Sequence, residues 1–133
     1  MGAAAAEPLS EPVALVADDD REVRELVAGF LRREGYSVLE AGDGIEALHL
    51  ASTYRPDLTI LDVLMPGLTG FEVAYELRCS PETEDMAIMM LSGHGTQDDV
   101  LIGLAAGADD YVTKPFSRRR LQLRLRDLVS NAA

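Results

Sequence analysis

The sequence predicts an α/β protein in which a parallel sheet is covered by helices on both faces. Five short apolar segments alternate with five segments whose apolar residues recur at three- and four-residue spacing. The apolar segments are continuous, as at residues 86–91, which indicates burial on both sides. A chain of 133 residues is long enough for one domain. We expect that domain at residues 12–130, a flexible tail at 1–11, and at 131–133 the C-terminal end or the start of a linker.

Breakers and apolar periodicity place the ten elements in order. In the first half we expect a strand at 13–17, a helix that carries the apolar residues of 23–31 and ends at Gly35, a strand at 36–40, and a helix at about 45–51. In the second half we expect a strand at 58–62, a helix at 71–77, a strand at 86–91, a helix at about 97–106, a strand at 109–113, and a last helix after Lys114-Pro115. Ligands of open α/β sheets bind beyond the carboxyl ends of the strands, so the residues after each strand are the candidates for function.

Composition excludes several classes of function. The formal net charge of −11 disfavours binding to nucleic acid or to an anionic membrane, and no apolar run reaches membrane-spanning length. Cys79 is the one cysteine, so an intramolecular disulfide and a cysteine-based zinc site are excluded. The N-terminus lacks the basic start and apolar run of a signal peptide. We therefore expect a cytoplasmic protein.

Polar residues follow four of the five predicted strands. They are Asp18, Asp19 and Asp20 after the first strand, Asp62 at the end of the third, Ser92 and Gly93 after the fourth, and Lys114 after the fifth. Each position by itself has an ordinary explanation: a helix cap, a turn, a loop opening or a surface lysine. If the strands are parallel, however, all four groups meet at one edge of the sheet.

The combined group suits phosphoryl transfer to an aspartate. Carboxylates crowded together without a counter-charge repel one another and raise one another's pKa. A hard divalent cation relieves that repulsion, and oxygen ligands with room left for phosphate favour Mg²⁺. Lys114 adds a fixed positive charge and Ser92 a hydroxyl donor. A cation, a lysine, a hydroxyl and a free carboxylate are the groups that this chemistry requires.

Four motifs make the chain resemble the receiver domain of two-component response regulators, over about residues 13–129. The matching stretches are Val16-Ala17-Asp18-Asp19-Asp20, Leu61-Asp62-Val63-Leu64-Met65-Pro66-Gly67, Met90-Leu91-Ser92-Gly93, and the run from Gly107 to Phe116. The resemblance implies a flavodoxin-like, doubly wound, five-stranded sheet in the order 2-1-3-4-5, as in chemotaxis receivers. It also implies a signalling protein rather than a conventional enzyme, since such a domain catalyses only its own phosphorylation and slow autodephosphorylation.

Roles for single residues follow from this resemblance. Asp62 is implied as the phosphoacceptor, with Mg²⁺ bound directly by Asp19, by Asp62 and by the backbone carbonyl of Leu64, and through water by Asp18. Lys114, Ser92 and the N–H of Gly93 are implied as phosphoryl-binding groups, Ser92 and Tyr111 as the switch pair, and Pro115 as a cis-proline. Asp20 has no ligand role in the family, and we expect it to cap the helix that follows.

Three other functions compete with this interpretation. A phosphatase of the haloacid dehalogenase type needs a second aspartate two positions after its nucleophile, where this chain has Leu64. A flavodoxin-like flavin binder needs a phosphate-binding loop after the first strand, where Asp18, Asp19 and Asp20 would repel phosphate. A receiver that has lost phosphorylation and only binds partners would not need the complete set of aspartates, serine and lysine.

The output surface is expected around the fourth helix, fifth strand and fifth helix. Nearly every residue of 100–106 is apolar, more than one face of a helix can bury, and Leu123 points away from the apolar face of the last helix. The candidate partner face comprises Val100, Ile102, Asp110, Leu123 and Arg124. An Asp110–Arg124 ion pair across this face would be compatible with the dimers of winged-helix regulators, although Val100 and Arg120 replace a basic–acidic pair used there. The expected partners are a sensor histidine kinase or phosphotransfer protein, and a second copy through this face.

Overall fold

The computed structural model describes residues 11–93 and 95–132, so the expected tail, apart from Glu11, lies outside the described residues. Its centre is a five-stranded parallel sheet in the order β2-β1-β3-β4-β5. The strands are β1 (Val13–Ala17), β2 (Ser37–Ala41), β3 (Leu58–Leu61), β4 (Ala87–Ser92) and β5 (Asp110–Thr113). This is the fold class and strand order that the sequence predicts, and both predictions are confirmed.

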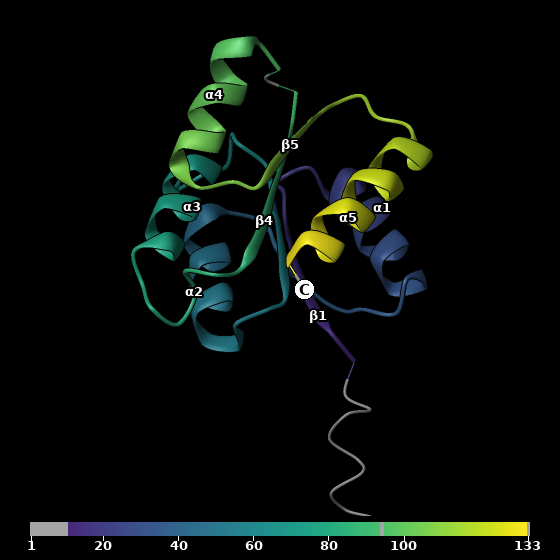
Figure 1. Ribbon diagram of the computed structural model, residues 1–133, viewed down its shortest axis with the longest axis horizontal. Helices are drawn as coiled ribbons and strands as arrows, with labels where there is room; N and C mark the ends of the chain where they lie inside the picture. The colour runs from purple at the N-terminus through teal and green to yellow at the C-terminus, as the bar shows by residue number, and fades with distance from the viewer. Residues whose placement is uncertain (1–10, 94, 133) are drawn as a thin grey trace, which may run out of the picture.

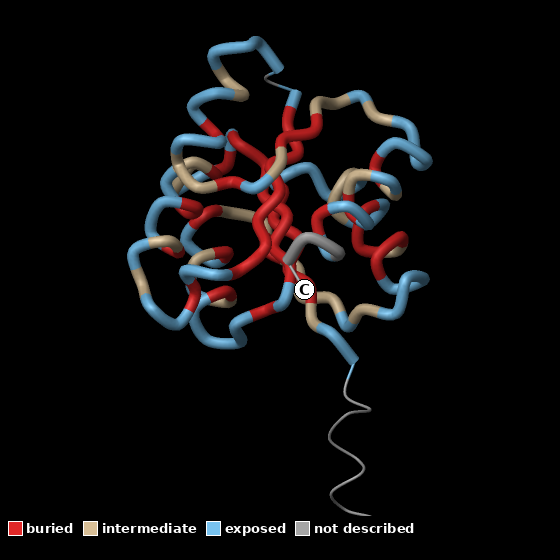
Figure 2. Tube along the Cα trace, in the orientation of Figure 1, coloured by how far each residue is buried: buried red, intermediate tan, exposed pale blue. Residues whose placement is uncertain are grey.

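In the part of the chain that the structure describes, helices cover the sheet on two sides, as Figure 1 shows. They are α1 (Arg21–Arg33), α2 (Gly44–Tyr54), α3 (Gly70–Arg78), α4 (Gln97–Ala106) and α5 (Arg118–Ala132). In that view α2, α3 and α4 lie on one side of the strands, and α1 and α5 lie on the other. The buried residues follow the strands through the middle of the molecule, as Figure 2 shows.

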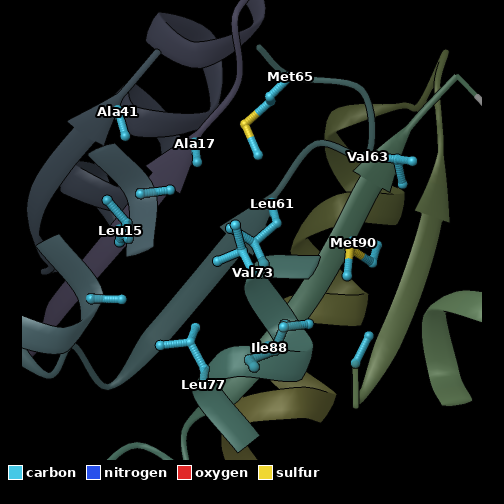
Figure 3. Packing of buried hydrophobic residues seen from close by; sticks show 14 of the residues in the cluster. Leu15, Ala17, Ala41, Leu61, Val63, Met65, Val73, Leu77, Ile88 and Met90 are labelled. Atoms are coloured by element: carbon cyan, nitrogen blue, oxygen red, sulfur yellow. The ribbon is translucent and has the colours of Figure 1, made fainter. Parts of the chain in front are cut away.

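Each face of the sheet packs its own apolar cluster, because successive residues of a strand point to opposite sides. Leu15 and Ala17 belong to the cluster beneath α2 and α3, part of which Figure 3 shows. Ala14 and Val16 belong to the cluster beneath α1 and α5. The central strands are therefore buried on both sides, which explains their continuous apolar sequences.

Local capping fixes where the helices begin. The carboxylate of Asp20 accepts hydrogen bonds from the N–H groups of Glu22 and Val23, as expected for an N-cap. The helix expected at about 45–51 begins slightly earlier, at Gly44, because the carboxylate of Asp43 accepts from the N–H of Glu46 and caps α2 there. These caps set the direction in which the chain leaves β1 and β2 at the carboxyl edge of the sheet.

Candidate functional site

The strand register brings the predicted site residues together at one edge. Ala17 lies opposite Leu61 in the β1–β3 pair, and the N–H of Asp62 donates to the carbonyl of Ala17 (2.9 Å). On the other side of the site, the N–H of Lys114 donates to the carbonyl of Ser92 (2.8 Å). The residues at the carboxyl ends of β1, β3, β4 and β5 therefore lie at one edge of the sheet.

Three carboxylates converge there. Asp18, Asp19 and Asp62 each offer one oxygen, and these three atoms lie within 4.8 Å of one another. Asp18 and Asp62 are buried, whereas Asp19 is exposed. Three hard oxygen ligands with one open side are a donor set that suits Mg²⁺ and leaves room for a phosphoryl group.

Lys114 reaches the same pocket from the end of β5. Its Nζ forms an ion pair with Asp18 Oδ2 (2.7 Å) and lies 3.6 Å from Asp62 Oδ1. The Lys114–Pro115 peptide is cis, the isomer implied by the sequence resemblance. The ammonium thus lies against two of the three clustered carboxylates, and one positive charge does not balance the three negative ones.

Asp62 carries the electrostatic consequence of this excess. Its pKa is raised to about 6, first because burial disfavours the charged carboxylate and next because Asp18 repels it. Lys114 and the N–H of Val63, which donates to Asp62 Oδ1 (2.9 Å), offset part of that rise. A divalent cation among the carboxylates would remove the repulsion, so the residues present fit Mg²⁺.

The predicted switch pair is in contact. Ser92 is buried at the end of β4. Burial raises the pKa of the Tyr111 phenol overall, and Ser92 lies close enough to lower that pKa in part. Tyr111 is buried beneath α4, where a Cβ atom at Gly103 would lie 2.8 Å from its Cδ2 atom. The inward position of the tyrosine therefore depends on the absence of a side chain at Gly103.

The candidate partner face is only partly as expected. Ile102 and Leu123 are half exposed, at 52% and 50%. Val100 instead packs against the core cluster beneath α2 and α3, so its expected place on an open face needs correction. Arg124 pairs with Asp110 of the same chain, its Nε donating to Asp110 Oδ2 (2.8 Å), which joins α5 to β5.

The structure also places residues at the site that the sequence analysis missed. Arg24 donates from α1 to the carbonyl of Asp18 (2.9 Å). Gly70 begins α3 and packs against the backbone of Asp62 and Val63. A Cβ atom at Gly70 would lie 2.3 Å from the carbonyl oxygen of Asp62. For Arg24, the one available indication in the sequence was an arginine soon after the first strand together with Glu40 at the end of the neighbouring strand.

The family model of the response regulator receiver domain matches residues 14–126. The chain belongs to the response regulator receiver family. Receiver domains of this family are signalling proteins that accept a phosphoryl group on an aspartate, bind Mg²⁺ in an acidic pocket, and interact with histidine kinases or phosphotransfer proteins. Among the residues that the structure describes, no helix is both long and apolar enough to cross a membrane.

Curated proteins of similar sequence support membership in this family. The chain is 46% identical over 115 residues to the response regulator MprA of Mycobacterium sp. (strain KMS), covering 86% of this chain and 49% of that protein. It is 42% identical over 115 residues to the probable transcriptional regulatory protein TcrX of Mycobacterium tuberculosis, covering 86% of this chain and 48% of that protein. The receiver thus spans about half the length of these curated relatives.

Solved structures share the receiver's fold. A crystal structure described as a response regulator from Chloroflexus aurantiacus superposes with a TM-score of 0.85 at 36% identity, covering 91% of this chain and 99% of that one. The receiver domain of the sensor histidine kinase PA1611 from Pseudomonas aeruginosa superposes with a TM-score of 0.82 at 30% identity, covering 91% and 99%. That second structure has a magnesium ion coordinated in its active site cleft.

Proposed function

We propose that Asp62 is the phosphoacceptor of this receiver and that a sensor histidine kinase or phosphotransfer protein is its donor. The observation that supports this proposal most directly is the position of the buried Asp62 carboxylate, which lies beside Asp18, Asp19 and the ammonium of Lys114. In the reaction, an oxygen of Asp62 attacks the phosphorus of a phosphohistidine. The P–N bond breaks, and its electron pair leaves with the imidazole.

The remaining pocket residues would bind and orient the phosphoryl group. When bound, Mg²⁺ neutralises charge on the transferring phosphoryl oxygens. Asp19, Asp62 and the Leu64 carbonyl would hold it directly, and Asp18 through water. Lys114 would shift from its ion pair with Asp18 toward a phosphoryl oxygen, while the Ser92 hydroxyl and the N–H of Gly93 donate to others.

The proposed output is a change at α4, β5 and α5. When Ser92 turns toward the phosphoryl group, its surroundings beside Tyr111 change, and the surface above that tyrosine changes with them. We propose that this face, including Ile102 and Leu123, contacts a partner or a second copy. The receiver would occupy residues 12–130 of a cytoplasmic protein and would itself bind neither nucleic acid nor membrane.

Phosphorylation of one site tests the proposal. Incubation with acetyl phosphate and Mg²⁺ should add one phosphoryl group, observed by intact-protein mass spectrometry, and Asp62→Asn should abolish the addition. Asp85→Asn is the matched control, because Asp85 precedes β4 at the opposite end of the sheet and should leave labelling unchanged. Undiminished labelling of Asp62→Asn would contradict the assignment.

A further inference from the structure

Asp18 is held at each of its four polar atoms. Its N–H donates to the carbonyl of Ala41 (3.1 Å), and its Oδ1 accepts from the N–H of Asp20 (2.9 Å). Its Oδ2 binds Lys114 Nζ (2.7 Å), and its carbonyl oxygen accepts from Arg24 Nη1 (2.9 Å). Of these four contacts, the one from Arg24 comes from a helix side chain that is neither a proposed metal ligand nor a proposed phosphoryl-binding group.

The guanidinium of Arg24 is itself oriented by Glu40. Arg24 Nε donates to Glu40 Oε1 (3.2 Å), and Arg32, also on α1, donates from Nη2 to Glu40 Oε2 (3.1 Å). The Arg24 side chain is mostly buried at 19% exposure, whereas that of Arg32 is half exposed. The carboxylate of Glu40 at the end of β2 therefore accepts hydrogen bonds from both arginines. Of the two, Arg24 also donates to the carbonyl of Asp18.

The contact acts on the next residue along the chain. The carbonyl of Asp18 and the N–H of Asp19 belong to one planar peptide unit. Fixing that carbonyl oxygen fixes the plane from which the Asp19 side chain leaves, and the carboxylate of Asp19 is the exposed member of the cluster. Because Mg²⁺ demands near-ideal octahedral geometry, a small rotation of this peptide would displace a ligand.

We propose that Arg24 is a positioning residue for Mg²⁺: it holds the Asp18–Asp19 peptide so that the carboxylate of Asp19 meets the metal. This inference rests on the proposed function, in which Asp19 is a ligand. In a purely stabilising role, Arg24 would act only through its ion pair with Glu40, whose side chains are 19% and 28% exposed, and its loss would lower stability without changing Mg²⁺ affinity. Arg32 also pairs with Glu40, and among the described residues no hydrogen bond joins it to Asp18, so substitution of Arg32 is the matched control.

Mg²⁺ titrations of the full chain test the inference, followed by the amide NMR signals of residues 19 and 62. Arg24→Gln should weaken Mg²⁺ binding about tenfold, the effect typical of losing a group that orients a metal ligand. Arg32→Gln should bind Mg²⁺ as wild type does. Arg24→Lys keeps the charge but not the planar fork, so its affinity should fall between wild type and Arg24→Gln. Asp19→Ala should bind weakest of all.

Unfolding in urea without Mg²⁺ separates positioning from stability, because both glutamine variants lose one contact with Glu40. Unchanged Mg²⁺ affinity in Arg24→Gln, or an equal loss in Arg32→Gln, would overturn the inference while leaving the proposed function intact. If Arg24→Gln does not fold, unchanged affinity in Arg24→Lys has the same meaning. Absence of Mg²⁺ binding in wild type would instead overturn the metal part of the proposed function and the inference with it.

Discussion

The pKa of Asp62 makes the stability of the metal-free protein depend on pH. It is raised to about 6 in the folded state, chiefly by burial and then by Asp18, against about 3.9 in an unfolded chain. The folded protein therefore binds more protons than the unfolded chain between these values. The favourable contribution is complete below pH 4 and is lost as pH rises through 6. At neutral pH the charged carboxylate opposes folding.

We therefore expect Asp62→Asn to raise the free energy of unfolding at pH 7.5, with EDTA present, by about 1–2 kcal/mol. At pH 4.5 the difference between variant and wild type should shrink, because the folded wild type is then protonated at Asp62. Urea unfolding at the two pH values measures this. Asp85→Asn, which removes a carboxylate at the opposite end of the sheet, serves as the control. A stability advantage of Asp62→Asn that is equal at both values would contradict the raised pKa.

Residues at strand ends could be predicted because parallel topology alone brings them together. Asp18, Asp62 and Lys114 needed only the strand order and the points at which the apolar runs stop. Arg24 and Gly103 could not be predicted in this way. The role of Arg24 depends on the direction that its long side chain takes from α1, and the role of Gly103 depends on how closely α4 approaches Tyr111. Apolar periodicity encodes neither of these features.

Gly103 decides how α4 lies over β5. A Cβ atom there would meet Tyr111 at 2.8 Å and Phe71 at 3.3 Å, so Gly103→Ala overpacks the contact. Glycine to alanine inside a helix normally stabilises by about 0.5–1 kcal/mol. We expect the overpacking to exceed that gain, with a net loss of about 1–2 kcal/mol in urea unfolding.

Two comparisons isolate the contact in this experiment. Gly29→Ala lies in α1 with no atom within 4 Å of the added Cβ, so it should show the helical gain alone. In a Tyr111→Ala background, Gly103→Ala should also become stabilising, because the clashing ring is gone. Destabilisation by Gly103→Ala that persists in that background would show that Tyr111 is not the cause.

Element boundaries followed the sequence closely where caps or breakers mark them, and α4 begins and ends where the pattern predicts. The deviations have local causes. β5 begins at Asp110 rather than 109, since the carboxylate of Asp109 turns back to accept from the N–H of Ile88 (2.8 Å). The same carboxylate binds Arg78 (2.9 Å), so Asp109 serves the loop before the strand.

At the scale of the whole molecule, the proposed output face predicts self-association that depends on phosphorylation. Leu101, Ile102 and Leu123 are exposed apolar residues on α4 and α5, and they offer an apolar surface to a second copy. Sedimentation velocity with and without a beryllofluoride mimic should show association of wild type with the mimic. The Ile102→Asp, Leu123→Asp double variant should remain monomeric.

Exposed apolar residues on other faces supply the control for this experiment. Leu26 on α1 and Tyr75 on α3 are exposed to a similar degree, at 51% and 59%. Leu26→Asp, Tyr75→Asp should therefore associate as wild type does if the α4 and α5 face is the interface. Equal association of both double variants, or no effect of the mimic on wild type, would exclude this face.

The thin attachment of α4 has a consequence for hydrogen exchange. Among its ten residues, all within the described part of the chain, Gly103 alone is buried, and Thr96, Asp99 and Gly107 secure only its ends. Local opening of α4 would therefore expose less apolar surface than opening of the central strands, and would require less free energy. Amide protons of residues 101–104 should exchange through such openings, nearly independent of denaturant. Amide protons of Val16 and Ile60 should exchange only through global unfolding. Because α4 opens at lower cost than these strands, a modest free energy from phosphorylation at Asp62 would suffice to change the populations of its conformations.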